Sequence, residues 1–155
     1  IGLINEFENL IVTRTFAKAW GLAGLRVGYG ISNNDLMKYL HKIKSMYEIN
    51  TLGSNILCNA IDNYEEVMKS VNRLNQGKKW FMSEMKSMNF ETWESHGNFS
   101  HVNFAKNTEI IHNALSDLVL YRKSFEEECL MGYSRFSSTI KEEFKLIVDK
   151  IKSAI

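Results

Sequence analysis

Hydrophobic positions change their period along the chain, and the first fifty residues predict two strands followed by a helix. The apolar run Leu10 to Val12 and the stretch Leu25 to Ile31 have the length and composition of buried strands. Asn33 and Asn34 can cap a helix whose apolar positions recur at helical spacing to about Ile49. The chain therefore begins with a strand, a loop, a second strand and a helix.

The middle of the chain predicts one long helix or two. From Ser54 to about Met88 the apolar residues keep a helical period, and Gly77 marks the candidate break. No proline interrupts this stretch.

The last third of the chain predicts a small unit of mixed strands and helices. Thr139 followed by Glu142 has the pattern of a capping box that opens a final amphipathic helix. The order strand, helix, strand, strand, helix after residue 90 is typical of an α+β unit. The predicted strands are Phe99 to Phe104, Leu118 to Tyr121 and Tyr133 to Ser137, and the helix between them is Glu109 to Leu115.

Composition narrows the class of function. The chain has 155 residues, of which 45% are apolar, so it can bury roughly 70% of its unfolded surface. Nineteen basic and eighteen acidic side chains leave a net charge of +1, which favours neither nucleic acid nor an anionic membrane surface. No apolar run approaches the roughly 20 residues that span a membrane. Cys58 and Cys129 form no CxxC pair, and the histidines lack metal-binding spacing. We expect a cytoplasmic protein with a small-molecule partner, no metal, no nucleic acid and no membrane.

The segment LIVTRTFAKAWGLAGLRVGYGI carries the candidate chemistry, because it sets Thr15, Lys18 and Arg26 among several glycines. A lysine that attacks an aldehyde must first lose its proton, and a sheltered place near another cation favours this. The guanidinium of Arg26 can present two N–H groups to a phosphate, and Thr15 adds a hydroxyl. The three side chains together suit a phosphorylated aldehyde.

This segment resembles the lysine motif of fold-type-I pyridoxal-phosphate enzymes, of the histidinol-phosphate aminotransferase type. The match covers the hydroxyl of Thr15, the lysine and the run GLAGLRVGY. The resemblance implies that Lys18 forms the internal aldimine with pyridoxal 5'-phosphate and then moves the substrate proton as general base and acid. It also implies that Thr15 and Arg26 hold the cofactor phosphate.

The resemblance continues through SHGNF, LVLYR and SRFSSTIKEEF, in the family's order. It implies that Arg135 binds the substrate carboxylate, through a two-pronged contact that lysine cannot reproduce. It implies that Arg122 contacts the distal substrate group, often a phosphate. Leu118 and Ala17 depart from the pattern, as does the lack of a proline near Tyr47, and these departures leave the substrate open rather than the cofactor.

The implied fold is α/β to α+β, the C-terminal part of such an enzyme. Residues 1–50 would end the large cofactor-binding domain and keep a remnant of its sheet, and residues 51–155 would form the linking helix and the small domain. The implied reaction is transamination between an amino acid or phosphorylated amine and an oxo-acid acceptor, by a homodimer. A decarboxylase or lyase on the same scaffold is the alternative, as is a fragment that acts only as a structural or dimerisation domain.

Only 17 residues precede Lys18. In the family, an aspartate that pairs with the pyridine nitrogen and a glycine-containing phosphate loop lie upstream of the lysine motif. We therefore expect the isolated chain to be inactive, to bind the cofactor weakly and to self-associate.

Overall fold

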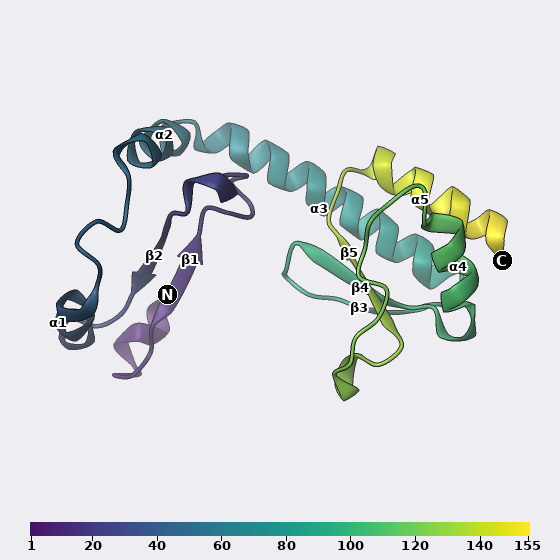
Figure 1. The fold of residues 1–155 in the computed structure, drawn as a ribbon, viewed down its shortest axis with the longest axis horizontal. Coiled ribbons are helices and arrows are strands. Elements are labelled where there is room, and N and C mark those ends of the chain that lie inside the picture. The colour runs from purple at the N-terminus through teal and green to yellow at the C-terminus, as the bar shows by residue number, and fades with distance from the viewer. The chain divides into compact units, whose positions relative to one another are not determined.

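A computed structural model describes all 155 residues, which form two compact units, Ile1–Val67 and Met68–Ile155 (Figure 1). Helices and small antiparallel sheets occur together, in agreement with the predicted fold class. No helix combines the length and the apolar character that crossing a bilayer requires. The predicted assignment of residues 1–50 and 51–155 to two parts of a larger enzyme stays a prediction.

The first unit holds a two-stranded antiparallel sheet. Strand β1 (Val12–Thr15) pairs with β2 (Gly28–Ile31), and the register sets Thr15 opposite Gly28. The expectation of buried strands is wrong, since most residues of both strands are exposed. A two-stranded ribbon needs a further layer to bury a face, and the only buried large apolar residues of this unit are Phe16 and Val27.

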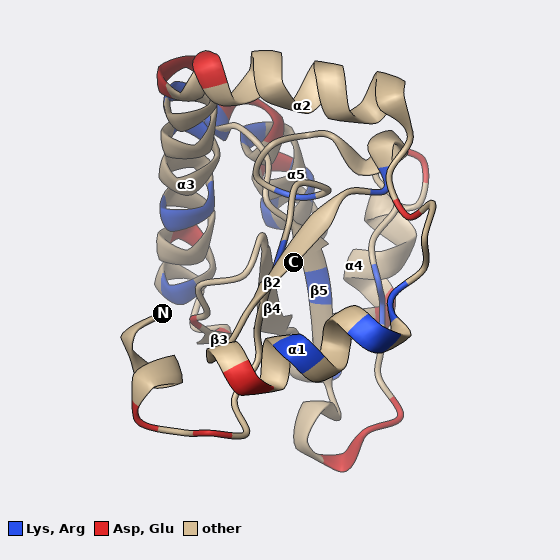
Figure 2. Cartoon of the chain, turned by 90° about the vertical axis from the view of Figure 1, so that its left-hand side faces the viewer, with Lys and Arg blue, Asp and Glu red and all other residues tan.

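Helix α1 (Asn34–Ile43) begins where the sequence predicts. The side chain of Asn33 accepts a hydrogen bond from the Leu36 amide at 2.9 Å, so the predicted cap is present. The helix ends at Ile43 rather than near Ile49, because Lys44 adopts an extended conformation. Helix α1 contains both acidic and basic residues, as Figure 2 shows, and its Lys38 pairs with Asp35 at 2.8 Å.

Two helices follow, α2 (Thr51–Asp62) and α3 (Tyr64–Ser87). The break lies at Asn63, whose side chain donates to the Asn59 carbonyl at 2.8 Å, and the candidate break at Gly77 is wrong. Gly77 is buried inside α3, where a Cβ would collide with the carbonyl oxygen of Thr139. The glycine therefore serves close packing rather than helix termination.

The second unit contains a three-stranded antiparallel sheet in the order β3 (Glu91–Trp93), β4 (Phe99–Asn103), β5 (Tyr133–Ser137). Strand β3 has no counterpart in the sequence prediction.

The predicted strand Leu118 to Tyr121 is absent. The amides of Leu118 and Val119 donate to the Leu115 carbonyl at the end of the preceding helix, so they are not free to join the sheet. Pairing with β5 occurs only one residue later, as an isolated bridge between Arg122 and Arg135.

Three helices supply the rest of the core, α3, α4 (Thr108–Leu115) and α5 (Lys141–Ala154). They pack on the sheet face that carries Val102 and Phe136 (Figure 1). The Phe81 and Phe144 rings stack at 4.3 Å between centroids. The core cluster consists of Phe81, Met85, Phe90, Val102, Phe104, Ile111, Leu115, Phe136, Phe144, Ile147, Val148 and Ile151.

The predicted capping box of the last helix is wrong. Helix α5 begins at Lys141 with Ile140 as its N-cap, and no side chain caps it. Thr139 instead brings its backbone carbonyl against Gly77 of α3. The apolar face of the helix is otherwise as predicted, because Phe144, Ile147, Val148 and Ile151 are all buried.

Candidate functional site

The candidate lysine lies in the loop between β1 and β2. At the base of the loop, Phe16 N donates a hydrogen bond to the Val27 carbonyl at 3.3 Å. Inside the loop, Leu22 N donates a hydrogen bond to the Phe16 carbonyl at 3.0 Å. Gly21, at a φ of 69°, donates its amide to the Lys18 carbonyl at 3.0 Å. This turn fixes the backbone at Lys18, while its side chain is exposed.

Thr15 and Arg26 each precede one of the two residues that close the loop. The Thr15 hydroxyl oxygen accepts from the Ala17 amide at 3.0 Å, which leaves its proton available for another partner. Arg26 adopts the left-handed conformation with a φ of 54°, and its guanidinium donates to the Ala23 carbonyl at 3.5 Å.

A primary amine, a hydroxyl and a guanidinium therefore border one loop, and all three side chains are exposed. This donor set fits a ligand that joins a phosphate to an aldehyde, since the hydroxyl and guanidinium are phosphate donors and the amine is a nucleophile. The three residues border the same loop, and the roles predicted for them stay predictions.

The two candidate substrate arginines lie together in the second unit. Arg122 and Arg135 exchange backbone hydrogen bonds of 3.1 and 2.8 Å. The Arg122 guanidinium lies 4.0 Å from the centre of the Phe125 ring, and the Arg135 guanidinium lies 5.9 Å from the same centre. Arg122 also pairs with Glu127 at 3.6 Å. One aromatic ring thus supports both cationic groups.

His101 lies on the same face of the sheet and is not among the predicted site residues. It is the register partner of Arg135 and is 8% exposed. Burial and the neighbouring Arg135 charge both lower the pKa of His101 below its ordinary value. The alternation in Phe99–Phe104 is the signal that could have placed His101 on the face opposite Val102.

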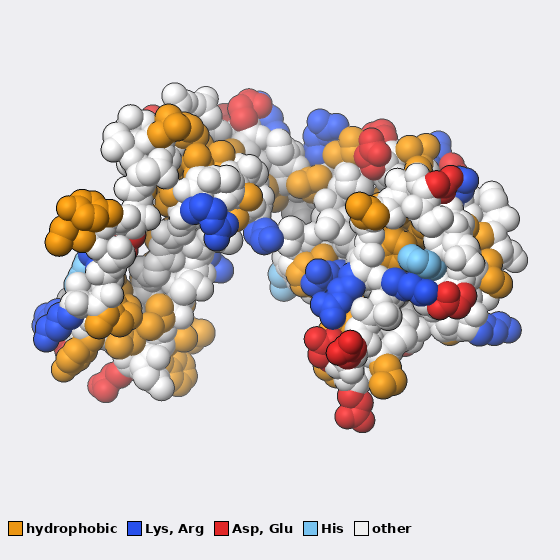
Figure 3. Space-filling view, in the orientation of Figure 1, with side chains coloured by type: hydrophobic (Ala, Val, Ile, Leu, Met, Phe, Trp, Pro, Cys, Tyr) orange, Lys and Arg blue, Asp and Glu red, His pale blue; other side chains and the backbone are white.

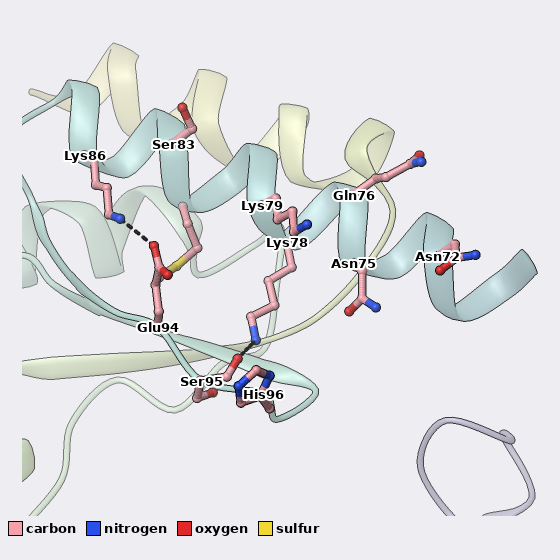
Figure 4. A pocket seen from close by; sticks show the side chains of 11 residues that line it. Asn72, Asn75, Gln76, Lys78, Lys79, Ser83, Lys86, Glu94, Ser95 and His96 are labelled. Atoms are coloured by element: carbon pink, nitrogen blue, oxygen red, sulfur yellow. Dashed lines mark hydrogen bonds and ion pairs between the residues drawn. The ribbon is translucent and has the colours of Figure 1, made fainter. Parts of the chain in front are cut away.

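A separate hollow of about 990 Å³ lies between α3 and the β3–β4 turn, and its charged lining residues are Lys78, Lys79, Lys86 and Glu94 (Figure 4). Lys86 pairs with Glu94 at 2.6 Å. Lys78 donates to the Ser95 and Gly97 carbonyls at 2.5 and 2.8 Å, and burial lowers its pKa despite the opposing effect of Glu94. Lys78 and Lys86 therefore hold the β3–β4 turn against α3. None of the predicted site residues lines this hollow.

Comparisons with known proteins identify the family of this chain. The profile of the family "Aminotransferase class I and II" matches residues 1–153. A curated histidinol-phosphate aminotransferase of Thermoanaerobacter sp. (strain X514) is 33% identical over 100% of this chain and 44% of its own length. The chain therefore spans less than half the length of this relative.

Solved structures give the same fold. Histidinol-phosphate aminotransferase from Sinorhizobium meliloti, in complex with pyridoxal-5'-phosphate, superposes with a TM-score of 0.78 at 21% identity, over 98% of this chain and 44% of that one. A decarboxylase from Sulfurospirillum multivorans superposes with a TM-score of 0.78 at 21% identity, over 98% of this chain and 45% of that one. With the family profile covering nearly the whole chain, the protein belongs to the class I and II aminotransferase family and is similar to histidinol-phosphate aminotransferases.

Proposed function

We propose that the native protein is a pyridoxal-phosphate-dependent aminotransferase of the histidinol-phosphate type. It would transfer the amino group of an amino acid or a phosphorylated amine to an oxo acid. The observation that supports this proposal is the loop between β1 and β2, which is bordered by an amine, a hydroxyl and a guanidinium in a chain of the aminotransferase family.

Lys18 is the proposed catalytic residue of this loop. Its amine would bind the cofactor and afterwards carry the proton to and from the substrate α-carbon. Thr15 and Arg26 would hold the cofactor phosphate with a hydroxyl and two N–H donors. When bound, the cofactor supplies the electron sink that stabilises negative charge at the substrate carbon.

Arg135 and Arg122 are the proposed substrate ligands. Arg135 would bind the substrate carboxylate with both prongs of its guanidinium, and Arg122 would bind the distal phosphate. Their neighbouring backbones and shared Phe125 ring support this pairing, because two cations held side by side favour a substrate with two anionic groups.

The native protein would act as a homodimer in the cytoplasm, and the isolated chain would be inactive. The exposed strands β1 and β2 support the expected inactivity of the isolated chain, since polar contacts to a cofactor are weak in a site open to water. A cofactor titration of the isolated chain with a glutamate-dependent turnover assay tests it. Micromolar saturable binding together with turnover would contradict it.

A decarboxylase is the second candidate, because a decarboxylase of known structure shares the fold. Turnover of the native protein with and without an oxo-acid acceptor separates the two reactions. An aminotransferase requires the acceptor, whereas a decarboxylase releases carbon dioxide without it.

The substitution Arg135→Lys tests the substrate site itself. It should raise the KM for the amino donor by about tenfold or more and leave cofactor affinity nearly unchanged, because a point charge replaces a planar fork. Arg73→Lys on the exposed surface of α3 is the matched control. Equal losses of substrate and cofactor affinity in Arg135→Lys would mean that Arg135 supports folding instead.

A further inference from the structure

His101 lies within a cage of aromatic rings on the sheet face that carries the arginine pair. The rings of Phe99 and Phe125 lie 5.2 and 5.4 Å from the imidazole, measured between centroids. Trp93 and Tyr133 lie 6.1 and 6.4 Å away. The cage excludes water from most of the imidazole, so charges near it interact more strongly than they would in bulk solvent.

The same two phenylalanine rings also contact Arg135. Its guanidinium lies 5.5 Å from the centre of Phe99 and 5.9 Å from that of Phe125. The imidazole and the guanidinium thus share both supports, and register pairing sets them side by side on adjacent strands. The charge of Arg135 therefore affects the free energy of protonating His101.

The free site disfavours a proton on His101 for two reasons. Burial removes solvation from the imidazolium, and the positive charge of Arg135 repels it. An anion bound to Arg135 offsets the second of these effects and leaves only the first.

We propose that His101 takes up a proton when an anionic substrate binds at Arg135, so that the affinity of the arginine pair for anions rises as the pH falls. This inference rests on the proposed role of Arg135 as a substrate ligand. His101 acts here as a positioning residue that adds charge beside the ligand. The other titratable or charged groups around it are Tyr133 of β5, Glu91 of β3, which bonds Tyr133, and Arg122 with its partner Glu127 beyond the Phe125 ring.

The direction of the pH dependence follows from linkage. The pKa of His101 is lowered in the free site, and anion binding raises it. Affinity therefore begins to increase as the pH falls through the pKa of the complex. The gain is complete below the pKa of the free site, where the imidazole is charged in both states.

Sulfate is a suitable probe, because it stays a dianion throughout the range in which histidine titrates. Calorimetric titration of this chain should show sulfate binding on the order of fivefold more tightly at about pH 5.5 than at about pH 8. In the proton NMR spectrum, sulfate should move the titration midpoint of the His101 ring signal to higher pH. The signals of His41, His96 and His112 serve as internal references.

Three variants separate the inference from the proposed function. His101→Phe fills the cage without a titratable group, and His101→Gln provides a second neutral replacement; either should bind sulfate with the pH dependence lost. Arg135→Met should lose the binding at both pH values. An unchanged His101 midpoint with Arg135-dependent binding would overturn the role of His101 alone, whereas sulfate binding indifferent to Arg135→Met would overturn the arginine site and the inference with it.

Discussion

The unit Ile1–Val67 leaves most of its large apolar side chains exposed, whereas the unit Met68–Ile155 buries a large share of its own in one core cluster. In the first unit Ile43, Met46 and Tyr47 are 80%, 81% and 88% exposed. In the second, Phe81 and Phe144 are fully buried. Figure 3 shows the open apolar side chains of the first unit as orange groups on its surface. Lys18 thus belongs to the unit with the smaller core, and Arg122 and Arg135 belong to the unit with the larger one.

The largest expected difference between the units is in the cost of removing a phenylalanine. Phe81→Ala should lower the free energy of unfolding of its unit by about 3–5 kcal/mol, because it empties a closed core beside Phe144 and Phe136. Phe16→Ala should cost about 1–2 kcal/mol, since the rings that pack against Phe16, those of Trp20 and Tyr29, are themselves partly exposed. Native-state hydrogen exchange of amides in each unit measures both values. Equal losses of stability in the two variants would contradict the difference between the cores of the two units.

Arg26 tests whether the first unit, which has few buried apolar residues, holds a cofactor-binding group. Arg26→Gly suits the left-handed backbone at a φ of 54°, so it removes the guanidinium without adding strain. In the native protein it should weaken cofactor binding by about 2–5 kcal/mol, the usual cost of removing a charged partner. Its free energy of unfolding should stay within about 0.5 kcal/mol of the wild type. A cofactor titration beside the control Arg73→Ala measures the effect, and an unchanged dissociation constant would make Arg26 structural.

Glycines provide the smallest and most local test. Gly77→Ala should destabilise the second unit by about 1–3 kcal/mol, because its Cβ would meet the backbone carbonyl of Thr139. Gly24→Ala in the first unit has nothing within 4 Å of the added Cβ and should change stability by less than about 0.5 kcal/mol. Denaturant titration of both variants gives the two values. A tolerated Gly77→Ala would show that α3 can move away from Thr139.

Local signals in the sequence predicted the helices well where burial is one-sided. The four apolar residues of α5 from Phe144 to Ile151 are buried as their spacing predicts. The break at Asn63 was missed, because Gly77 is the stronger local signal and its need for close packing arises only once Thr139 is beside it. Strand β3 is too short to show a hydrophobic period. The amide of Leu118 donates its hydrogen bond to the turn that ends α4, so it is not available to a strand.

Part of the candidate site can be predicted from a local motif, and part depends on the fold. Thr15, Lys18 and Arg26 are close in sequence, so a motif can place them on one loop without knowledge of the fold. The grouping of Arg135 with Phe125 and His101 depends on strand register and on the path of the connecting segment, which periodicity does not specify. A motif can therefore propose the role of an arginine but cannot name the rings and the histidine that set its surroundings.

Reductive trapping is the decisive test of the proposal that Lys18 binds the cofactor. The native protein is incubated with pyridoxal phosphate, reduced with borohydride and digested, and the modified peptide is identified by mass spectrometry. We expect the label on Lys18, and we expect Lys18→Ala to abolish both the imine absorbance and nearly all activity. A label on other lysines with Lys18 unmodified, or an imine band that persists in Lys18→Ala, would contradict it.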